Sequence, residues 1–194
     1  SSLVEASNAR AAFNPQDADA REDITDTLVV TIDPPDAKDF DDAISLTRSR
    51  QGSWILGVHI ADVSHFVVEG SALDQAACDR GNSVYLPGRV LPMLPEMLSN
   101  GVCSLQPGQP RYTKSVYLTY GKDGKVLSTR FANTIMKSSA RLTYQQAARV
   151  LKGDTRGVAP DVVALLREME ELARSIENRR RGAGMLQLKM AETE

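Results

Sequence analysis

The sequence has few of the residues that build covalent cross-links or soft-metal sites. Only two cysteines, Cys78 and Cys103, and two histidines occur among its 194 residues. Two cysteines are too few for a disulfide framework and lie too far apart for a zinc-knuckle spacing, so we expect buried free thiols. His59 and His65 are interpreted as structural, because a histidine in a strand is more often a satisfied core residue than a ligand.

Long apolar segments are also missing. No run approaches the roughly 18 apolar residues of a membrane span, and the first ten residues, SSLVEASNAR, lack the basic flank and apolar run of a signal peptide. The composition, with 42% hydrophobic and 25% charged residues, is that of a globular domain and excludes a disordered or collagen-like chain. These absences predict a soluble cytoplasmic protein with no membrane partner.

Charges of both signs are present, but they are unevenly distributed. The formal net charge is only −2, yet residues 1–42 contain 11 acidic and 3 basic residues, whereas residues 43–194 contain 14 acidic and 20 basic ones. Between Arg80 and Arg141 nine basic residues accompany only Glu96 and Asp123. An acidic segment followed by a basic one predicts a surface that faces a polyanion.

Hydrophobic periodicity and turn residues predict an α+β fold. Strands are expected at 28–33, 43–48, 54–63, 83–87, 113–120 and 125–136, and helices at 71–81, at 92–98, after 143 and over 160–182. Gly52 and the sequence GKDG indicate two hairpins, so the mixed sheet should be largely antiparallel with helices packed on it. Residues 1–22 lack sustained periodicity and are interpreted as a lead-in segment.

The segment TIDPPDAKDFDDAI, residues 31–44, carries the strongest functional signal. Five aspartates lie within ten residues, and only Lys38 offsets them. Like charges this close repel each other, and the apolar segments on both sides should keep the carboxylates from separating into water. Hard divalent cations prefer such oxygen ligands, and two of them roughly 3.5–4 Å apart can promote phosphodiester hydrolysis. If the segment is extended, Asp39 and Asp41 project to one side.

Two other interpretations of this segment stay open from the residues alone. A charge run can be a solvated acidic turn, although five aspartates beside buried strands are unusual for a turn. A calcium loop of the EF-hand type fits less well, because the glycine at the sharp bend and the distal glutamate are both missing.

Four sequence blocks together resemble the catalytic domain of the ribonuclease II and ribonuclease R family. They are TIDPPDAKDFDDAI, VHIADVSHFV, SVYLPGRVLPMLPEMLSNGVCSL and ARLTYQQA, in family order. The resemblance implies a processive 3′→5′ exoribonuclease that hydrolyses single-stranded RNA to nucleoside 5′-monophosphates with Mg²⁺ or Mn²⁺. Its signature carboxylates correspond to Asp33, Asp39, Asp41 and Asp42. Of these, Asp33, Asp41 and Asp42 are implied to lie nearest the metal ions, whereas Asp36 lies outside the set.

Two tyrosines and several basic residues are candidates for RNA contact. From the residues alone Tyr85 packs in a half-buried strand, but the resemblance implies stacking on a terminal base, which contributes roughly 1–3 kcal/mol per base. Tyr144 corresponds to a family aromatic residue or packs in the first turn of a helix. The basic residues that we expect to contact phosphates include Arg80, Arg89 and Arg111.

The family's catalytic domain is longer than this chain, and its later blocks, including an arginine-rich motif, have no counterpart after Gly182. We therefore expect residues 23–194 to form the N-terminal part of such a domain. Its partners would be the remainder of the domain and the flanking cold-shock and S1 RNA-binding domains. The chain alone is then expected to be weakly active or inactive. The alternative is a noncatalytic RNA-binding or regulatory relative, and the motifs do not separate ribonuclease II from ribonuclease R.

Overall fold

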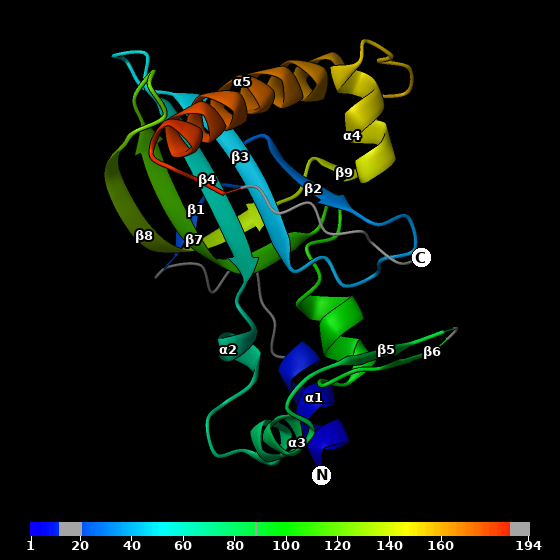
Figure 1. Ribbon diagram of the computed structural model, residues 1–194. Coiled ribbons are helices and arrows are strands. Elements are labelled where there is room, and N and C mark those ends of the chain that lie inside the picture. Colours follow the sequence, from blue (N-terminus) through cyan, green and yellow to red (C-terminus); the bar gives the residue numbers. More distant parts are fainter. Residues whose placement is uncertain (12–20, 88, 187–194) are drawn as a thin grey trace.

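The computed structural model describes residues 1–11, 21–87 and 89–186, which are arranged around a seven-stranded sheet (Figure 1). The strands follow the order β1-β8-β7-β4-β3-β2-β9 across it. Their bounds are β1 (Glu22–Asp23), β2 (Val29–Asp33), β3 (Asp42–Arg48), β4 (Trp54–Ala61), β7 (Pro110–Tyr120), β8 (Val126–Lys137) and β9 (Ala140–Thr143). A separate two-stranded hairpin consists of β5 (Val84–Leu86) and β6 (Arg89–Leu91).

The sheet is largely antiparallel, as predicted. Both expected hairpins form, with β3 paired to β4 and β7 paired to β8. The two outermost pairs are parallel, because β1 runs with β8 and β9 runs with β2. The second of these pairings places Arg141 opposite Thr31 and Thr143 opposite Asp33. Residues that are far apart in the sequence thus meet at the end of the strand that delivers the first aspartate.

Helices cover the sheet and extend below it (Figure 1). Their bounds are α1 (Ser2–Ala11), α2 (Val63–Phe66), α3 (Ala72–Arg80), the short η2 (Leu98–Val102), α4 (Tyr144–Leu151) and α5 (Pro160–Gly182). Helices α4 and α5 pack on one face of the sheet, whereas α1, α2 and α3 lie with the β5–β6 hairpin in a second group at its lower end. In the part of the chain that the structure describes, no helix is both long and apolar enough to span a membrane.

The predicted helix starts have the expected hydrogen bonds. Ser71 caps α3 by accepting from the amide of Asp74, and Thr143 with Gln146 forms a reciprocal capping box at the start of α4. Gly81 ends α3 with a φ of 75°, a conformation that residues with a Cβ atom adopt rarely. Side chains at helix ends thus satisfy backbone groups that have no partner inside the helix.

Three expectations differ from the structure. Helix α1 lies in the segment that we interpreted as a lead-in, and it is held by Glu5, whose carboxylate accepts from the amides of Ala72 and Leu73. The helix expected at 92–98 lies further along the chain, because η2 spans Leu98–Val102 with a kink at Gly101. Cys103 is buried as expected, whereas Cys78 is exposed.

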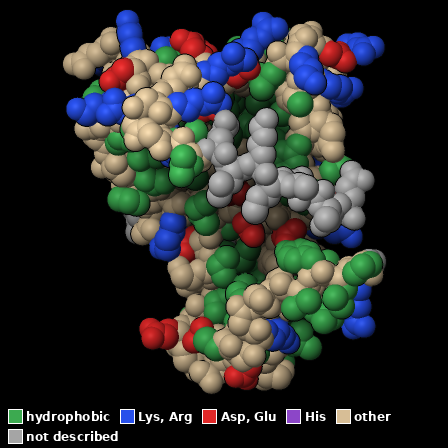
Figure 2. Space-filling model, viewed as in Figure 1, with side chains coloured by type: hydrophobic (Ala, Val, Ile, Leu, Met, Phe, Trp, Pro, Cys, Tyr) green, Lys and Arg blue, Asp and Glu red, His purple; other side chains and the backbone are tan. Residues whose placement is uncertain are grey.

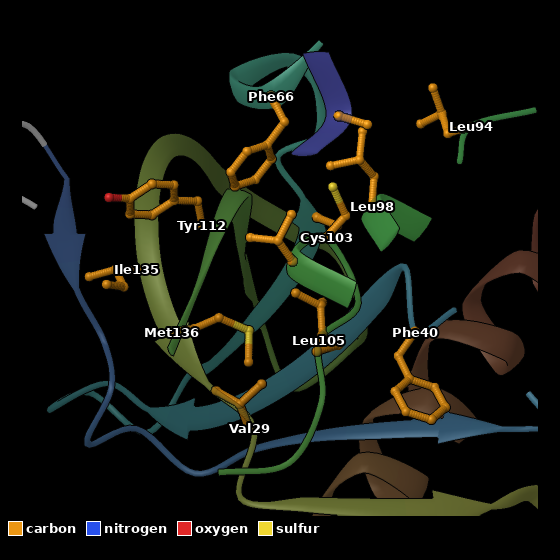
Figure 3. Close-up of a cluster of buried hydrophobic side chains, with 14 of the residues drawn as sticks. Val29, Phe40, Phe66, Leu94, Leu98, Cys103, Leu105, Tyr112, Ile135 and Met136 are labelled. Carbon is orange, nitrogen blue, oxygen red and sulfur yellow. The ribbon is translucent and has the colours of Figure 1, made fainter. Parts of the chain in front are cut away.

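One of the two buried clusters joins the sheet to the lower helices (Figure 3). Val29 and Met136 contribute to it from the sheet, and Phe66 and Leu98 contribute from α2 and η2. Phe40, from the loop between β2 and β3, is buried in the same cluster. Burial of this ring fixes the direction of the residues next to it along the loop.

Candidate active site

The loop between β2 and β3 gathers the aspartates that the sequence singled out. Asp33 is the last residue of β2, and Asp42 is the first residue of β3. Between them, the buried ring of Phe40 separates Asp39 from Asp41. Alternate side chains of an extended backbone point in opposite directions, so the two aspartates face away from the core. The structure agrees with this expectation, because both line the same pocket.

This pocket has a volume of about 640 Å³ and lies between the acidic loop and the β5–β6 hairpin. Figure 2 shows acidic side chains recessed in the hollow between the sheet and the lower group of elements. The acidic wall includes Asp33, Asp36, Asp39 and Asp41, and the opposite wall includes Tyr85, Val90, Glu96 and Asn100. Asp42 is exposed and does not line the pocket.

Mutual repulsion and burial perturb two of these carboxyl groups. Asp33 is only 8% exposed, and burial together with the charges of Asp42 and Asp39 raises its pKa, although Thr31 and Arg141 act in the opposite direction. The pKa of Asp41 is also raised, first by desolvation and then by the three neighbouring aspartates. Neighbouring carboxylates that raise one another's pKa are typical of a functional site rather than of a solvated turn.

Hydrogen bonds to the backbone hold the second half of the loop, residues 38–41. The buried hydroxyl of Ser104 donates to the carbonyl oxygen of Lys38 at 2.8 Å and accepts from the amide of Phe40 at 3.1 Å. The amide of Leu105 donates to the carbonyl of Phe40, and that of Ala61 donates to the carbonyl of Asp41. Asp39 is thus bracketed by bonds to Ser104, and the loop is pinned rather than free to move into solvent.

The donor set fits a hard divalent cation. Oxygen Oδ2 of Asp33 is buried and has no hydrogen-bond partner among the described residues, so a bound cation would satisfy it. Within residues 1–11, 21–87 and 89–186, no three acidic, histidine or cysteine side chains already meet in the geometry of a metal site. Mg²⁺ commonly uses one or two carboxylates and takes its other ligands from water and substrate phosphates, so such a triple group is not required.

Tyr85 does not pack as a half-buried strand residue. It is 67% exposed, and its hydroxyl donates to Oδ2 of Asp39 at 3.2 Å. The charge of Asp39 is the main reason that the pKa of Tyr85 is raised, which keeps the hydroxyl protonated as a donor. Tyr144, the first residue of α4, is also exposed, at 57%. Packing therefore explains neither tyrosine, and the ring of Tyr85 stands at the pocket wall, available for stacking.

The structure separates the predicted basic residues into two groups. Arg89, the first residue of β6, and Arg80, the last residue of α3, are exposed, and Arg80 donates to the carbonyl of Met93 just after the hairpin. Arg111 is only 9% exposed, and its guanidinium donates to the carbonyls of Ser104, Pro110 and Gly101. These bonds give Arg111 a structural role beside the residue that pins the acidic loop, and its burial is at odds with the expected phosphate contact.

Sequence reasoning did not assign a site role to Glu96 or Asn100, and it counted Arg141 only among the basic residues that could contact phosphates. Glu96 and Asn100 line the pocket opposite the acidic loop, and Arg141 donates to carbonyls of that loop. Glu96 did have a detectable signal, because it is one of only two acidic residues in the basic stretch. The contact of Arg141 with the acidic loop had no such signal, since it depends on the parallel pairing of β9 with β2.

Comparison with known proteins identifies the family. The family model of the RNB domain matches residues 21–194, which include every element of the pocket. The chain belongs to the RNB domain family. The resemblance drawn from the four sequence blocks is confirmed.

Individual relatives carry the name ribonuclease R. The protein of Chlamydia muridarum is 43% identical over 169 residues, which are 87% of this chain and 24% of the relative. The protein of Escherichia coli (strain K12) is 43% identical over 159 residues, which are 81% of this chain and 19% of the relative. The chain therefore spans about a quarter or less of the length of these curated relatives.

Solved structures confirm the predicted fold. Mycoplasma genitalium RNase R in complex with ribose-methylated single-stranded RNA has a TM-score of 0.91 and 33% sequence identity, with 99% of this chain and 30% of that chain covered. Yeast Ssd1, a pseudonuclease, has a TM-score of 0.72 and 24% identity, with 88% of this chain and 20% of that chain covered. Because the fold also occurs in a pseudonuclease, the argument for catalysis depends on the residues of the pocket.

Proposed function

We propose that this RNB domain chain carries the catalytic acidic loop of a cytoplasmic 3′→5′ exoribonuclease of the ribonuclease R type, which hydrolyses single-stranded RNA to nucleoside 5′-monophosphates. The observation that carries the proposal is the convergence of Asp33, Asp39 and Asp41 on one pocket whose other wall bears Tyr85. The ribonuclease R relatives, and the RNA in the Mycoplasma complex, support RNA as the polymer.

Asp33 and Asp41 from the pocket wall would hold Mg²⁺ or Mn²⁺, together with Asp42 at the start of β3, which lies outside the pocket lining but whose charge acts on both of them. When bound there, the ion supplies Lewis-acid stabilisation of the phosphate and lowers the pKa of the attacking water. Asp33 and Asp41 repel each other when both are charged, so bound positive charge favours their ionised forms. Asp39 accepts a hydrogen bond from the hydroxyl of Tyr85 on the hairpin. Its role would be to support the other carboxylates.

The pocket also has the features needed to bind a nucleotide whatever its base. The ring of Tyr85 offers a face on which every base can stack. Arg80 and Arg89 place positive charge beside the same hairpin, where they would contact phosphates in a salt-dependent way. Base stacking and phosphate contact carry no sequence information, as an enzyme that degrades RNA one nucleotide at a time requires.

A noncatalytic RNA-binding role is the second candidate, because the pseudonuclease Ssd1 shares the fold. The pocket of this chain favours catalysis over that alternative. A binding surface gains nothing from aspartates that repel an RNA backbone and each other, whereas a hydrolytic site needs them to hold cations at the scissile phosphate.

The test uses the natural protein that contains this chain, 5′-labelled single-stranded RNA and Mg²⁺ or Mn²⁺. Wild-type protein should shorten the RNA from its 3′ end and release nucleoside 5′-monophosphates. Asp41→Asn should bind the RNA about as tightly as wild type but shorten it at least about 100-fold more slowly, because transition-state charge stabilisation is lost. Near-normal degradation by this variant would contradict the proposal.

Asp26→Asn is the matched control. Asp26 is exposed and precedes β2, so it lies at the opposite end of that strand from Asp33. This variant removes one negative charge without touching the pocket, and it should degrade RNA at the wild-type rate. Tight RNA binding without degradation by the wild type would favour the noncatalytic role.

A further inference from the structure

The first half of the acidic loop, residues 34–37, has few backbone hydrogen bonds of its own. Pro34 and Pro35 follow Asp33 directly, and neither has a backbone N–H. This part of the loop can therefore be held only through its carbonyl oxygens. Its own contribution is one long turn bond, in which the amide of Ala37 donates to the carbonyl of Pro34 at 3.2 Å.

Arg141 supplies the missing donors from another strand. Its Nη2 atom donates to the carbonyl oxygen of Pro34 at 2.9 Å and to that of Pro35 at 2.8 Å. Its guanidinium carbon also lies 5.1 Å from the ring centre of Phe40, the residue that anchors the other half of the loop. One side chain thus contacts both halves of the segment that carries the aspartates.

The position of Arg141 is set by strand pairing rather than by its own loop. Strand β9 runs parallel to β2, and the register places Arg141 opposite Thr31, two residues before Asp33. The side chain therefore starts beside the strand and reaches forward over the turn that follows it. Asp33 is itself paired with Thr143 in this register, so Arg141 acts on the turn that follows Asp33.

Two of the three guanidinium nitrogens of Arg141 face the protein rather than solvent. Both bonds of Nη2 are made to loop carbonyls, and Nε is buried with no hydrogen-bond partner within the described part of the chain. A phosphate-binding arginine would instead present its fork of donors to solvent.

We propose that Arg141 is a positioning residue of the acidic loop, which fixes the Pro34–Pro35 turn so that the aspartates on either side converge on one pocket. The inference rests on the proposed function of that pocket as a divalent-cation site. Residues that orient metal ligands without touching the metal typically contribute about 10- to 100-fold to metal affinity. The loop order and the metal affinity should therefore fall together when Arg141 is removed.

The experiment compares wild-type chain with Arg141→Ala, Arg141→Lys and Arg149→Ala. Hydrogen exchange of the Ala37 amide reports on the turn without any metal, and titration with Mn²⁺ alone reports on the site. We expect Arg141→Ala to exchange about tenfold faster at Ala37 and to bind Mn²⁺ at least about tenfold more weakly. Exchange of the core amide of Tyr117 should not change, which excludes global destabilisation as the cause.

The other two variants separate geometry from charge. Arg141→Lys keeps a positive charge and a donor of similar reach, so it should recover part of both losses, but not the planar contact with Phe40. Arg149 is an exposed arginine of α4, and Arg149→Ala should match wild type in both measurements.

The outcomes distinguish this inference from the proposed function. If wild-type chain binds no Mn²⁺, the proposed cation site fails, and exchange at Ala37 still shows whether Arg141 holds the turn. Unchanged exchange in Arg141→Ala overturns the positioning role. Faster exchange with unchanged Mn²⁺ affinity overturns it as well, because the order of the turn would then not matter to the site.

Discussion

Burial of His59 makes the stability of the sheet depend on pH in a way that can be measured. The side chain is 0% exposed in the middle of β4, with Nε2 at 2.9 Å from the hydroxyl of Ser45 and Nδ1 at 2.7 Å from that of Ser115. Burial lowers its pKa from 6.5 to about 4, although Glu22 acts in the opposite direction. The expected structural role of this histidine is confirmed, and it is neutral at pH 7.

The size of the effect follows from this pKa difference. Between pH 6.5 and about pH 4 the unfolded chain binds a proton at this position and the folded chain does not, so the free energy of unfolding falls as the pH falls. A shift of about 2.5 pH units corresponds to about 3 kcal/mol for a buried group. This contribution is fully present above pH 6.5, is lost progressively as the pH falls from 6.5 to about 4, and is absent below that.

Urea unfolding at a series of pH values measures the effect, with the fluorescence of the single, buried Trp54 as the signal. Over this interval the free energy of unfolding of wild-type chain should fall by about 3 kcal/mol more than that of His59→Gln, which has no proton to bind. Equal pH dependence of wild type and His59→Gln would refute the reasoning.

Three further changes test other parts of the fold by the same unfolding measurement. Gly57→Ala should destabilise by about 1–3 kcal/mol, because its Cβ would lie 2.4 Å from the hydroxyl oxygen of Ser45; an unchanged midpoint would contradict this packing. Arg21→Ala should destabilise by about 1–3 kcal/mol, since the buried carboxylate of Asp62 loses its 2.7 Å ion pair and keeps only the Ser64 hydroxyl and Lys114 at 3.6 Å; an unchanged midpoint would refute that pairing. Thr143→Ala should cost about 1 kcal/mol through loss of the capping box, and Gly at the same position should cost less.

Local signals in the sequence were enough to predict most elements. Capping residues such as Ser71 and Thr143, and turn glycines such as Gly52, act on neighbours within a few positions, so they can be recognised without the rest of the fold. Helix α1 has no such signal, because its sequence SLVEASNARA carries no apolar stripe. It is ordered by tertiary contacts, through the buried Ala6 and the hydrogen bonds of Glu5 to the start of α3.

In the candidate site, too, local sequence predicted some features, whereas others depend on tertiary contacts. The aspartates are neighbours in the sequence, so their grouping, and the shared direction of Asp39 and Asp41, could be predicted from local geometry. The residues that complete the pocket come from distant segments. Glu96 reaches it from the stretch before η2, and Arg141 reaches the loop through the pairing of β9 with β2. The burial of Arg111 also depends on tertiary packing, which charge patterning cannot show.

The most direct test of the central claim is a calorimetric titration of this chain with Mn²⁺ at neutral pH. The account predicts saturable binding by wild type, loss of that binding in Asp33→Asn, and wild-type binding in Asp26→Asn, since only the first variant alters the buried carboxylate with an unsatisfied oxygen. No saturable binding by the wild type, or binding that Asp33→Asn leaves unchanged, would contradict the assignment of the acidic loop as a divalent-cation site.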